Sequence, residues 1–495
     1  MSLTTKLDAR ERIKGVLGFR GGVCIEYKFN SSFIMVGIRF SKLIFLAVAL
    51  AVTTFAAPAP ASSSAADSGS GTGSSHIPSS ALSPSSVASA PESSPTVPYA
   101  SNDPNEVLWG PDTPDIPQAI RGSLGASVLG PQDIGMVKEN ADFLAPPSTD
   151  SGSVPNAKWP MSLSHNRLQT GGWARQQNVG VMPIATAMAG VNMRLEAGAV
   201  RELHWHKTAE WAYILKGTVQ VTAVNADGQN YLGTVSEGDL WYFPPGVPHS
   251  LQATADLPEG AEFLLVFDDG AFSEDSTFLL TDWLAHVPKS VIAKNFHANI
   301  SAFDHIPAKE LYIFPSAPPP DDAVAPTSPQ GTTPDPYTFQ LSKVPATELA
   351  GGSVKVVDST TFKISKTIAV AEVTVDPGAM RELHWHPSQD EWSFFLEGRG
   401  RVTLFASSGQ ARTFDYQASR ARTQLIRYVP ATYGHYVENI GNTTLRFLEI
   451  FNTDRYQDIS LNQWLALTPP DLVKAHLQLD DDTIAHLSKT KPIVL

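Results

Sequence analysis

The sequence predicts an all-β protein built from two tandem copies of one antiparallel sandwich or barrel, with a few peripheral helices. The hexapeptide Arg-Glu-Leu-His-Trp-His occurs twice, at Arg201–His206 and at Arg381–His386. A Glu-Trp pair follows each copy within a few residues, at 210–211 and at 391–392. Around both copies, short apolar runs alternate with Gly and Pro, which is typical of antiparallel sandwiches and barrels. We therefore expect a duplication of one β domain.

Each repeat is expected to contain several short strands followed by a helix. The apolar runs that predict strands are 219–224, 240–243 and 263–267 in the first repeat, and 355–357, 370–375, 401–405 and 445–451 in the second. Helical segments are expected at 280–285, 461–467 and 471–487.

Changes in composition predict the remaining organisation. Residues 58–101 are rich in Ser, Pro and Ala, so we expect a disordered linker, since such a segment buries too little apolar surface to fold. Residues 102–157 are expected to form an irregular N-terminal arm. The expected domains are a first barrel at 158–315, a Pro/Asp/Thr-rich linker at 316–336, a second barrel at 337–469 and a C-terminal helical segment at 470–495.

The N-terminal region predicts a secreted protein. It has the three parts of a secretory signal, which are a basic start, a short apolar run and small residues: Arg39 and Lys42, then 43–55, then 56–57. We expect a signal peptide at 35–57, a true start at Met35 and an annotation extension at 1–34. The alternative, a signal anchor with a cytoplasmic tail, would require a longer apolar run. After cleavage we expect an extracellular protein without membrane contact.

Cysteine usage and charge limit the remaining possibilities. Cys24 is the single cysteine and precedes Met35, so the mature chain would contain no disulfide. We therefore expect its stability to come from the core and from a homo-oligomer. Sequons at Asn299 and Asn442 fit a secreted glycoprotein. A formal net charge of -13 argues against nucleic acid as a partner, because phosphate requires a basic surface.

The first repeat contains a candidate metal site. On a strand, His204 and His206 point to one face and Trp205 to the other. Glu210 follows one turn later, and His249 ends the Pro/Gly-rich stretch Pro-Pro-Gly-Val-Pro-His. Three imidazoles and one carboxylate leave about two open positions on an octahedral Mn or Fe ion, as a catalytic metal needs.

The second repeat offers the same residue types in the same order: His384, His386, Glu391 and His435. A single histidine is more often a core or surface residue than a ligand. Eight ligand-type residues in two matching orders make that alternative improbable.

These residues match the two cupin motifs. The first motif, Gly-x5-His-x-His-x(3,4)-Glu-x6-Gly, is met by Gly198, His204, His206, Glu210 and Gly217, and again by Gly378, His384, His386, Glu391 and Gly398. The second motif is met by Gly238, Pro244, Gly246 and His249, and by Pro430, His435 and Asn439. Two positions depart from it, because Ala253 replaces the Asn of the first repeat and Thr432 replaces a Gly of the second.

The chain thus resembles the secreted bicupin oxalate decarboxylases over about residues 158–491. This resemblance implies two double-stranded β-helix, or jelly-roll, barrels. It implies two Mn²⁺ per chain, O₂ as co-reactant, and cleavage of oxalate to formate and CO₂. Fe suits the same ligands and is less expected. An oxalate oxidase or another cupin dioxygenase is the alternative enzyme, and a storage-type bicupin without enzymatic activity is a more distant alternative.

Two arginines and one glutamate are candidate catalytic residues beside the metals. Arg201 and Arg381 precede each His-x-His by three positions, where a guanidinium can pair with a carboxylate substrate; a surface ion pair is the alternative. Residues 272–277 resemble the active-site lid of the family, whose Glu is the proton donor, here Glu274; a solvated loop is the alternative. The second repeat is three residues shorter at this point and has no matching Glu at 455–460.

Two further features distinguish the second repeat. Glu449 lies in an apolar strand where the first repeat has Leu265. It could serve as an acid or base at the second metal, or be a buried Glu paired with an arginine in the neighbourhood of Arg446, and both interpretations stay open. Between Gln417 and Tyr428, a basic stretch replaces the Gly-Asp turn of the first repeat. Residues 419–427 are either a real surface insertion or a mis-spliced gene segment, and we favour the second explanation.

Overall fold

A computed structural model of the protein describes Trp109 and residues 113–418 and 424–495. The predicted extension, signal peptide and linker up to residue 101, together with Cys24, lie outside this part of the chain. Among the described residues strands predominate over short helices, which confirms the all-β class. No helix in these ranges is long and apolar enough to cross a membrane.

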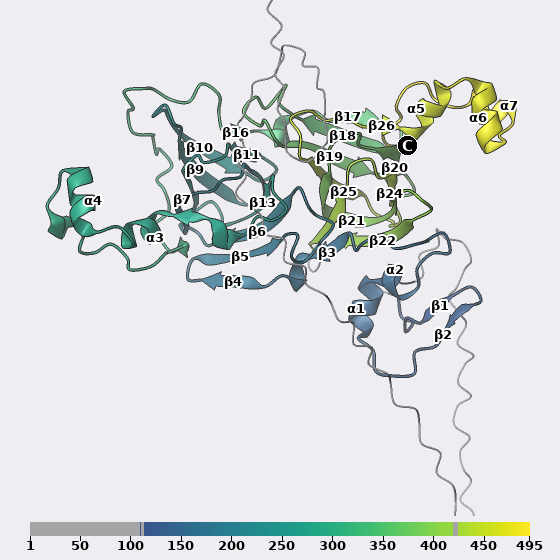
Figure 1. Ribbon diagram of the computed structural model, residues 1–495, viewed down its shortest axis with the longest axis horizontal. Helices are drawn as coiled ribbons and strands as arrows, with labels where there is room; N and C mark the ends of the chain where they lie inside the picture. Colours follow the sequence, from purple (N-terminus) through teal and green to yellow (C-terminus); the bar gives the residue numbers. More distant parts are fainter. Residues whose placement is uncertain (1–108, 110–112, 419–423) are drawn as a thin grey trace, which may run out of the picture. The chain divides into compact units, whose positions relative to one another are not determined.

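Two sheets form the first barrel (Figure 1). One contains β7 (Val200–Trp205), β9 (Thr218–Val224), β10 (Asn230–Ser236), β12 (His249–Ala253), β14 (Phe278–Leu279) and β15 (Ile313–Phe314). The other contains β4 (Asn166–Gln169), β5 (Gly172–Gln177), β6 (Ala189–Leu195), β8 (Glu210–Lys216), β11 (Leu240–Phe243), β13 (Ala261–Phe267) and β16 (Thr338–Phe339). Alternation along β12 buries His249, Leu251 and Ala253, so the metal-ligand face is also the core face.

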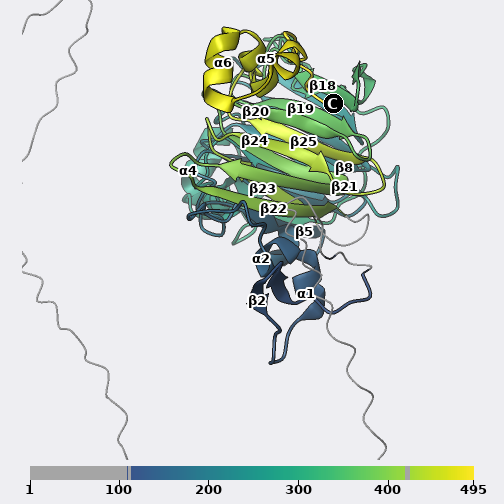
Figure 2. The same ribbon diagram turned by 90° about the vertical axis from the view of Figure 1, so that its right-hand side faces the viewer.

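The second barrel is one eleven-stranded sheet. Its strands are β17 (Thr347–Leu349), β18 (Gly352–Val357), β19 (Ala369–Val375), β20 (Met380–Trp385), β21 (Glu391–Phe405), β22 (Ala411–Ala418), β23 (Leu425–Val429), β24 (His435–Asn439), β25 (Leu445–Phe451) and β26 (Ile459–Ser460), joined by β3 (Lys158–Pro160). Figure 2 shows β18, β19, β25, β21 and β23 side by side. The long strand β21 replaces both β8 and β9, since it pairs with β23 and β25 at one end and with β22 and β24 at the other.

The two repeats exchange their first strands. β3 begins the first repeat but pairs with β23 of the second barrel, with Arg427 opposite Lys158. β16 begins the second repeat but pairs with β11 of the first barrel, with Leu240 opposite Phe339. One core cluster accordingly contains residues of both repeats, such as Trp211 and Trp392.

Most predicted elements are confirmed. The runs expected at 240–243, 370–375 and 445–451 coincide with or fall inside β11, β19 and β25. Both helices expected after the barrels form, as α3 (Leu280–Ala285) and α5 (Leu461–Ala466). A further helix, α4 (Lys289–Phe296), follows α3 along the chain.

The helical segment expected over 471–487 forms, but as two helices. It is divided into α6 (Pro470–Leu477) and α7 (Asp481–Ala485), because Gln478 adopts a left-handed conformation with φ 56° that ends α6. Asp480 then caps α7 by accepting a hydrogen bond from the backbone N–H of Thr483.

The unusual basic stretch is only partly described. Leu425, Ile426 and Arg427 are buried in β23, so the alternative of a surface insertion does not hold for these three residues. Their place is set by pairing with β21 on one side and β3 on the other. Residues 419–423 lie outside the described part of the chain.

The segment before the first barrel packs on the second barrel. It includes β1 (Ala119–Arg121), β2 (Leu124–Ala126), α1 (Ile134–Glu139) and α2 (Ala141–Leu144). The buried ammonium of Lys158 lies 2.9 Å from the carboxylate of Asp142 and also donates a hydrogen bond to the backbone oxygen of Asp415. Asp150 accepts hydrogen bonds from the backbone and hydroxyl of Thr413.

We expect Thr432→Gly to stabilise the protein by about 1 kcal/mol, because a side chain with a Cβ is strained in the left-handed region. Thr432 has φ 69° and Gly246, at the same place in the first barrel, has φ 76°. The backbone N–H of Thr432 donates to the carbonyl of His386 at 2.8 Å, and that of Gly246 donates to the carbonyl of His206 at the same distance. A higher midpoint of thermal unfolding is the expected result, with Gly246→Thr as the matched destabilising change. A lower midpoint for Thr432→Gly would contradict the strain argument.

Candidate metal centres

Four side chains of the first barrel converge on one point. His204 lies on β7, His206 directly follows that strand, Glu210 begins β8 and His249 begins β12. The pairing of β7 with β12 places His204 opposite His249. All four residues are buried, and their ligand atoms lie within 4.8 Å of one another.

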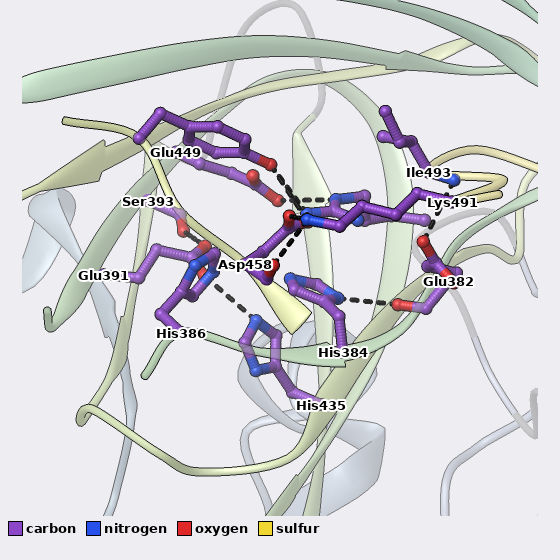
Figure 3. Close-up of polar contacts among 12 residues, drawn as sticks. Glu382, His384, His386, Glu391, Ser393, His435, Glu449, Asp458, Lys491 and Ile493 are labelled. Atoms are coloured by element: carbon purple, nitrogen blue, oxygen red, sulfur yellow. Dashed lines mark hydrogen bonds and ion pairs between the residues drawn. The ribbon is translucent and has the colours of Figure 1, made fainter. Parts of the chain in front are cut away.

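The second barrel repeats this arrangement with His384, His386, Glu391 and His435 (Figure 3). These four residues are also buried, and the pairing of β20 with β24 places His384 opposite His435. The second site forms although a basic stretch replaces the Gly-Asp turn that precedes the last histidine in the first repeat. β23 and β24 nevertheless bring His435 to within 3.0 Å of Glu391, measured from Nε2 to Oε2.

Backbone carbonyls orient the imidazoles. We call the four ligand-type residues of each barrel a cradle. In the first cradle, the Nδ1 atoms of His204, His206 and His249 lie 2.5–2.8 Å from the carbonyls of Glu202, Thr208 and Val247. In the second cradle, the Nδ1 atoms of His384, His386 and His435 lie 2.7–2.9 Å from the carbonyls of Glu382, Gln457 and Tyr433. Since a carbonyl only accepts, Nδ1 carries the proton and Nε2 presents its lone pair to the cradle.

Both cradles fit a divalent metal. The buried Nε2 atoms of His249, His384 and His386 have no hydrogen-bond partner among the described residues. Burial, and then the charge of Arg201, holds the pKa of His204 well below its usual range. Burial likewise lowers the pKa of His386 to about 4. Neutral imidazoles beside one carboxylate are the donor set that Mn and Fe take in such sites.

The outer oxygen of the carboxylate ligand has different partners in the two cradles. Trp241 donates its indole N–H to Oε1 of Glu210 at 2.8 Å. In the second cradle, Ser393 donates to Oε1 of Glu391 at 2.5 Å, and the buried guanidinium of Arg427 pairs with the same oxygen. Trp241 and Arg427 lie before the motif prolines, at positions where the second motif specifies no residue, so only strand register could have identified them.

Arg201, Glu274 and Tyr312 form a buried cluster in the first barrel. The Nη2 atom of Arg201 lies 3.0 Å from Oε2 of Glu274, and the hydroxyl of Tyr312 donates to the same oxygen at 2.7 Å. The guanidinium also lies over the Tyr312 ring, 4.2 Å from its centroid. Glu274 is therefore not a fully solvated loop residue, although Asp275 beside it is exposed.

Tyr312 was not identified from the sequence. It precedes β15, which pairs with β7, and its backbone N–H donates to Glu202 at 2.7 Å. Burial, and then the charge of Glu274, holds the pKa of Tyr312 well above its usual range, so its hydroxyl stays a donor. No metal-ligand or lid motif includes it, and only the β15–β7 pairing brings it to Arg201.

The arginine of the second barrel has different partners. Nη2 of Arg381 lies 2.6 Å from Oδ2 of Asp458 and donates to the Tyr456 hydroxyl at 2.9 Å. Its Nε lies 3.6 Å from Oε1 of Glu449. Of the two interpretations left open for Glu449, a buried pairing with an arginine is present, but the arginine is Arg381 and not one near Arg446, which pairs with Glu397 and Glu372.

Neither carboxylate oxygen of Glu449 accepts a hydrogen bond from the described residues. Glu449 is buried opposite Ser393, as Leu265 is opposite Ala212 in the first barrel. The structure therefore confirms the substitution of a carboxylate for an apolar side chain beside the second cradle.

Comparison with known proteins relates these features to one family. The cupin family model matches residues 164–302 and 340–485. Oxalate decarboxylase OxdC of Bacillus subtilis (strain 168) is 54% identical over 384 residues, covering 77% of this chain and 97% of that protein. A probable oxalate decarboxylase of Arthroderma benhamiae is 41% identical over 358 residues, covering 70% of this chain and 85% of that protein.

Solved structures give the same result. The structure of oxalate decarboxylase from Bacillus subtilis at pH 4.6 matches with a TM-score of 0.73 and 54% identity, covering 77% of this chain and 98% of that one. A second structure of that enzyme, from work on its Mn(II) centres, also has a TM-score of 0.73 and covers 99% of its chain.

Proposed function

Because the chain belongs to the bicupin oxalate decarboxylase family of the cupin superfamily, we propose that it is a secreted, Mn²⁺-dependent enzyme whose first metal centre converts oxalate to formate and CO₂. The cluster of Arg201, Glu274 and Tyr312 beside the first cradle carries this proposal. It combines a carboxylate anchor, a carboxyl group on a lid and a phenol that orients it. The second cradle has no such glutamate on its shorter segment.

The residues of the first barrel have separate tasks in this reaction. With O₂ as a catalytic co-reactant, bound Mn²⁺ would supply the redox chemistry that weakens the C–C bond. Arg201 pairs with one carboxylate of hydrogen oxalate and stabilises its charge. Glu274 accepts the acidic proton of hydrogen oxalate and delivers it to the carbon from which CO₂ departs. The net reaction takes hydrogen oxalate to formate and CO₂, and O₂ is regenerated.

The main alternative, an oxalate oxidase, yields two CO₂ and peroxide from the same substrate. Purified protein should be assayed for metal content and for formate, CO₂ and peroxide from oxalate at acidic pH. We expect Mn in the protein and one formate per oxalate. Peroxide in place of formate would favour the oxidase, and inertness towards oxalate would favour a storage-type role. Fe as the bound metal would overturn the Mn assignment alone.

We also propose that the chain forms a homo-oligomer. Its peripheral helices expose large apolar side chains at Trp283, Phe296, Trp464 and Leu472, and surfaces of this kind often mark interfaces. Light scattering coupled to size-exclusion chromatography should give a mass several times that of one chain. A monomer at micromolar concentration would contradict this proposal. Mass spectrometry of the secreted protein would test cleavage near residue 57 and glycans at Asn299 and Asn442.

A further inference from the structure

We propose that Asp458 and Lys491 determine which of the two centres accepts oxalate. Lys491 holds Asp458 on Arg381, so the guanidinium of the second barrel is already occupied by an internal carboxylate. The second centre then binds a metal but excludes the substrate. This inference rests on the proposed function, because it takes the arginine beside each cradle as the anchor for oxalate.

Both oxygens of Asp458 are held by cationic side chains (Figure 3). Oδ2 lies 2.6 Å from Arg381 and also accepts a hydrogen bond from the Tyr456 hydroxyl at 3.3 Å. Oδ1 lies 2.5 Å from the Lys491 ammonium, which also donates to the backbone carbonyl of Asp458 at 2.5 Å. The Asp458 side chain is only 3% exposed and that of Lys491 is 33% exposed, so the pair with Arg381 is buried and the pair with Lys491 lies at the edge of the solvent.

The C-terminal tail fixes Lys491 in this position. Two residues further on, the backbone N–H of Ile493 donates to the carboxylate of Glu382 at 3.0 Å, and its carbonyl accepts from the N–H of Glu382 at 2.9 Å. Val494 forms a β-bridge with Arg381 itself. The lysine is therefore anchored to the strand that carries the arginine.

The first barrel lacks this pair at the same register positions. Phe278 and Ile459 pair with Trp205 and Trp385, which places Thr277 where the second barrel has Asp458. Ile313 and Val494 pair with Arg201 and Arg381, which places Glu310 where it has Lys491. The first barrel therefore has the hydroxyl of Thr277 in place of the Asp458 carboxylate. It has the carboxylate of Glu310 in place of the Lys491 ammonium.

These replacements alter what an incoming anion must displace. In the first barrel Arg201 pairs with Glu274, which belongs to the short turn η2 (Glu274–Ser276), and within the described part of the chain no lysine or second arginine pairs with Glu274. Oxalate can take the place of this carboxylate one for one. In the second barrel, Lys491 holds Asp458 in place, so Asp458 could leave Arg381 only by also giving up its ion pair with Lys491.

Oxalate binding to the Mn(II) of each centre can be measured without turnover, under anaerobic conditions. Full-length His204→Ala retains only the second cradle, and His384→Ala retains only the first. The Mn(II) electron paramagnetic resonance spectrum and the water-proton relaxation of each protein are followed during titration with oxalate. We expect a response from the His384→Ala protein and none from the His204→Ala protein at the same concentrations.

Weakening the hold of Lys491 and Asp458 on Arg381 should allow the second centre to respond to oxalate. In the His204→Ala background, Lys491→Met should lower the Kd for oxalate by at least about tenfold, while Lys491→Arg should keep the centre closed. Asp458→Asn is the second opening variant, should Lys491→Met fold poorly. Equal binding at both unaltered centres, or no gain in either opening variant that retains Mn(II), would overturn the inference. Failure of the first centre to respond would instead count against the proposed function.

Discussion

Glu274→Ala is expected to reduce formate production by about 10²–10⁴-fold, which is the usual contribution of a positioned general acid. The metal content should not change, because Glu274 is not one of the four residues of the first cradle. Its carboxylate instead contacts Arg201 and Tyr312 on the side where a bound oxalate would lie. Formate and peroxide should be assayed together, since loss of the proton donor leaves oxidation of the bound substrate as the competing outcome.

Asp275→Asn is the matched control for this change. Asp275 follows Glu274 in the same turn, but its side chain is 83% exposed and forms only a long ion pair, at 3.4 Å, with the half-buried Arg167. It should keep near-normal formate production, because a surface ion pair contributes little. Full formate production by Glu274→Ala would show that another group donates the proton. Equal losses in both variants would indicate that the turn matters only as a structural element.

The sequence predicted the cradles well because their determinants are local. Alternation along a strand places His204 and His206 on one face, and the Pro/Gly-rich turn sets His249. Thr432 was recognised as a departure from the motif, and it adopts the positive φ that the motif Gly would have. Such features follow from residues only a few positions apart.

What the sequence did not predict depends on distant chain segments. The exchange of β3 and β16 between the barrels follows from pairing, and no motif marks it. Tyr312 reaches Arg201, and Lys491 reaches Asp458, because segments more than 100 residues along the chain pair with the strands that carry the two arginines. The register of these edges is set by tertiary packing, so composition and spacing could identify the metal ligands but not the groups that distinguish the two centres.

Replacing the two arginines should have unequal consequences. Arg201→Met is expected to lower kcat/KM for oxalate by about 10²–10³-fold, as does the loss of one preorganised donor to a developing charge. The fold should persist, because Glu274 keeps its hydrogen bond from Tyr312 and lies on a turn next to an exposed residue. Thermal unfolding in the Mn-loaded state should therefore change little.

Arg381→Met should instead destabilise the protein by about 3–5 kcal/mol, the typical cost of leaving a buried charge without its partner. Arg381 lies against two buried carboxylates, and Glu449 accepts no hydrogen bond from any described residue. The double variant Arg381→Met/Glu449→Leu, which copies Leu265 of the first barrel, should recover part of the loss. If Arg201→Met and Arg381→Met lowered the unfolding midpoint equally, the two arginines would have the same structural role. We expect Arg201→Met to lose activity with little change in the unfolding midpoint, and Arg381→Met to lower the midpoint more strongly. That result would assign substrate anchoring to Arg201 in the first barrel and charge compensation to Arg381 in the second.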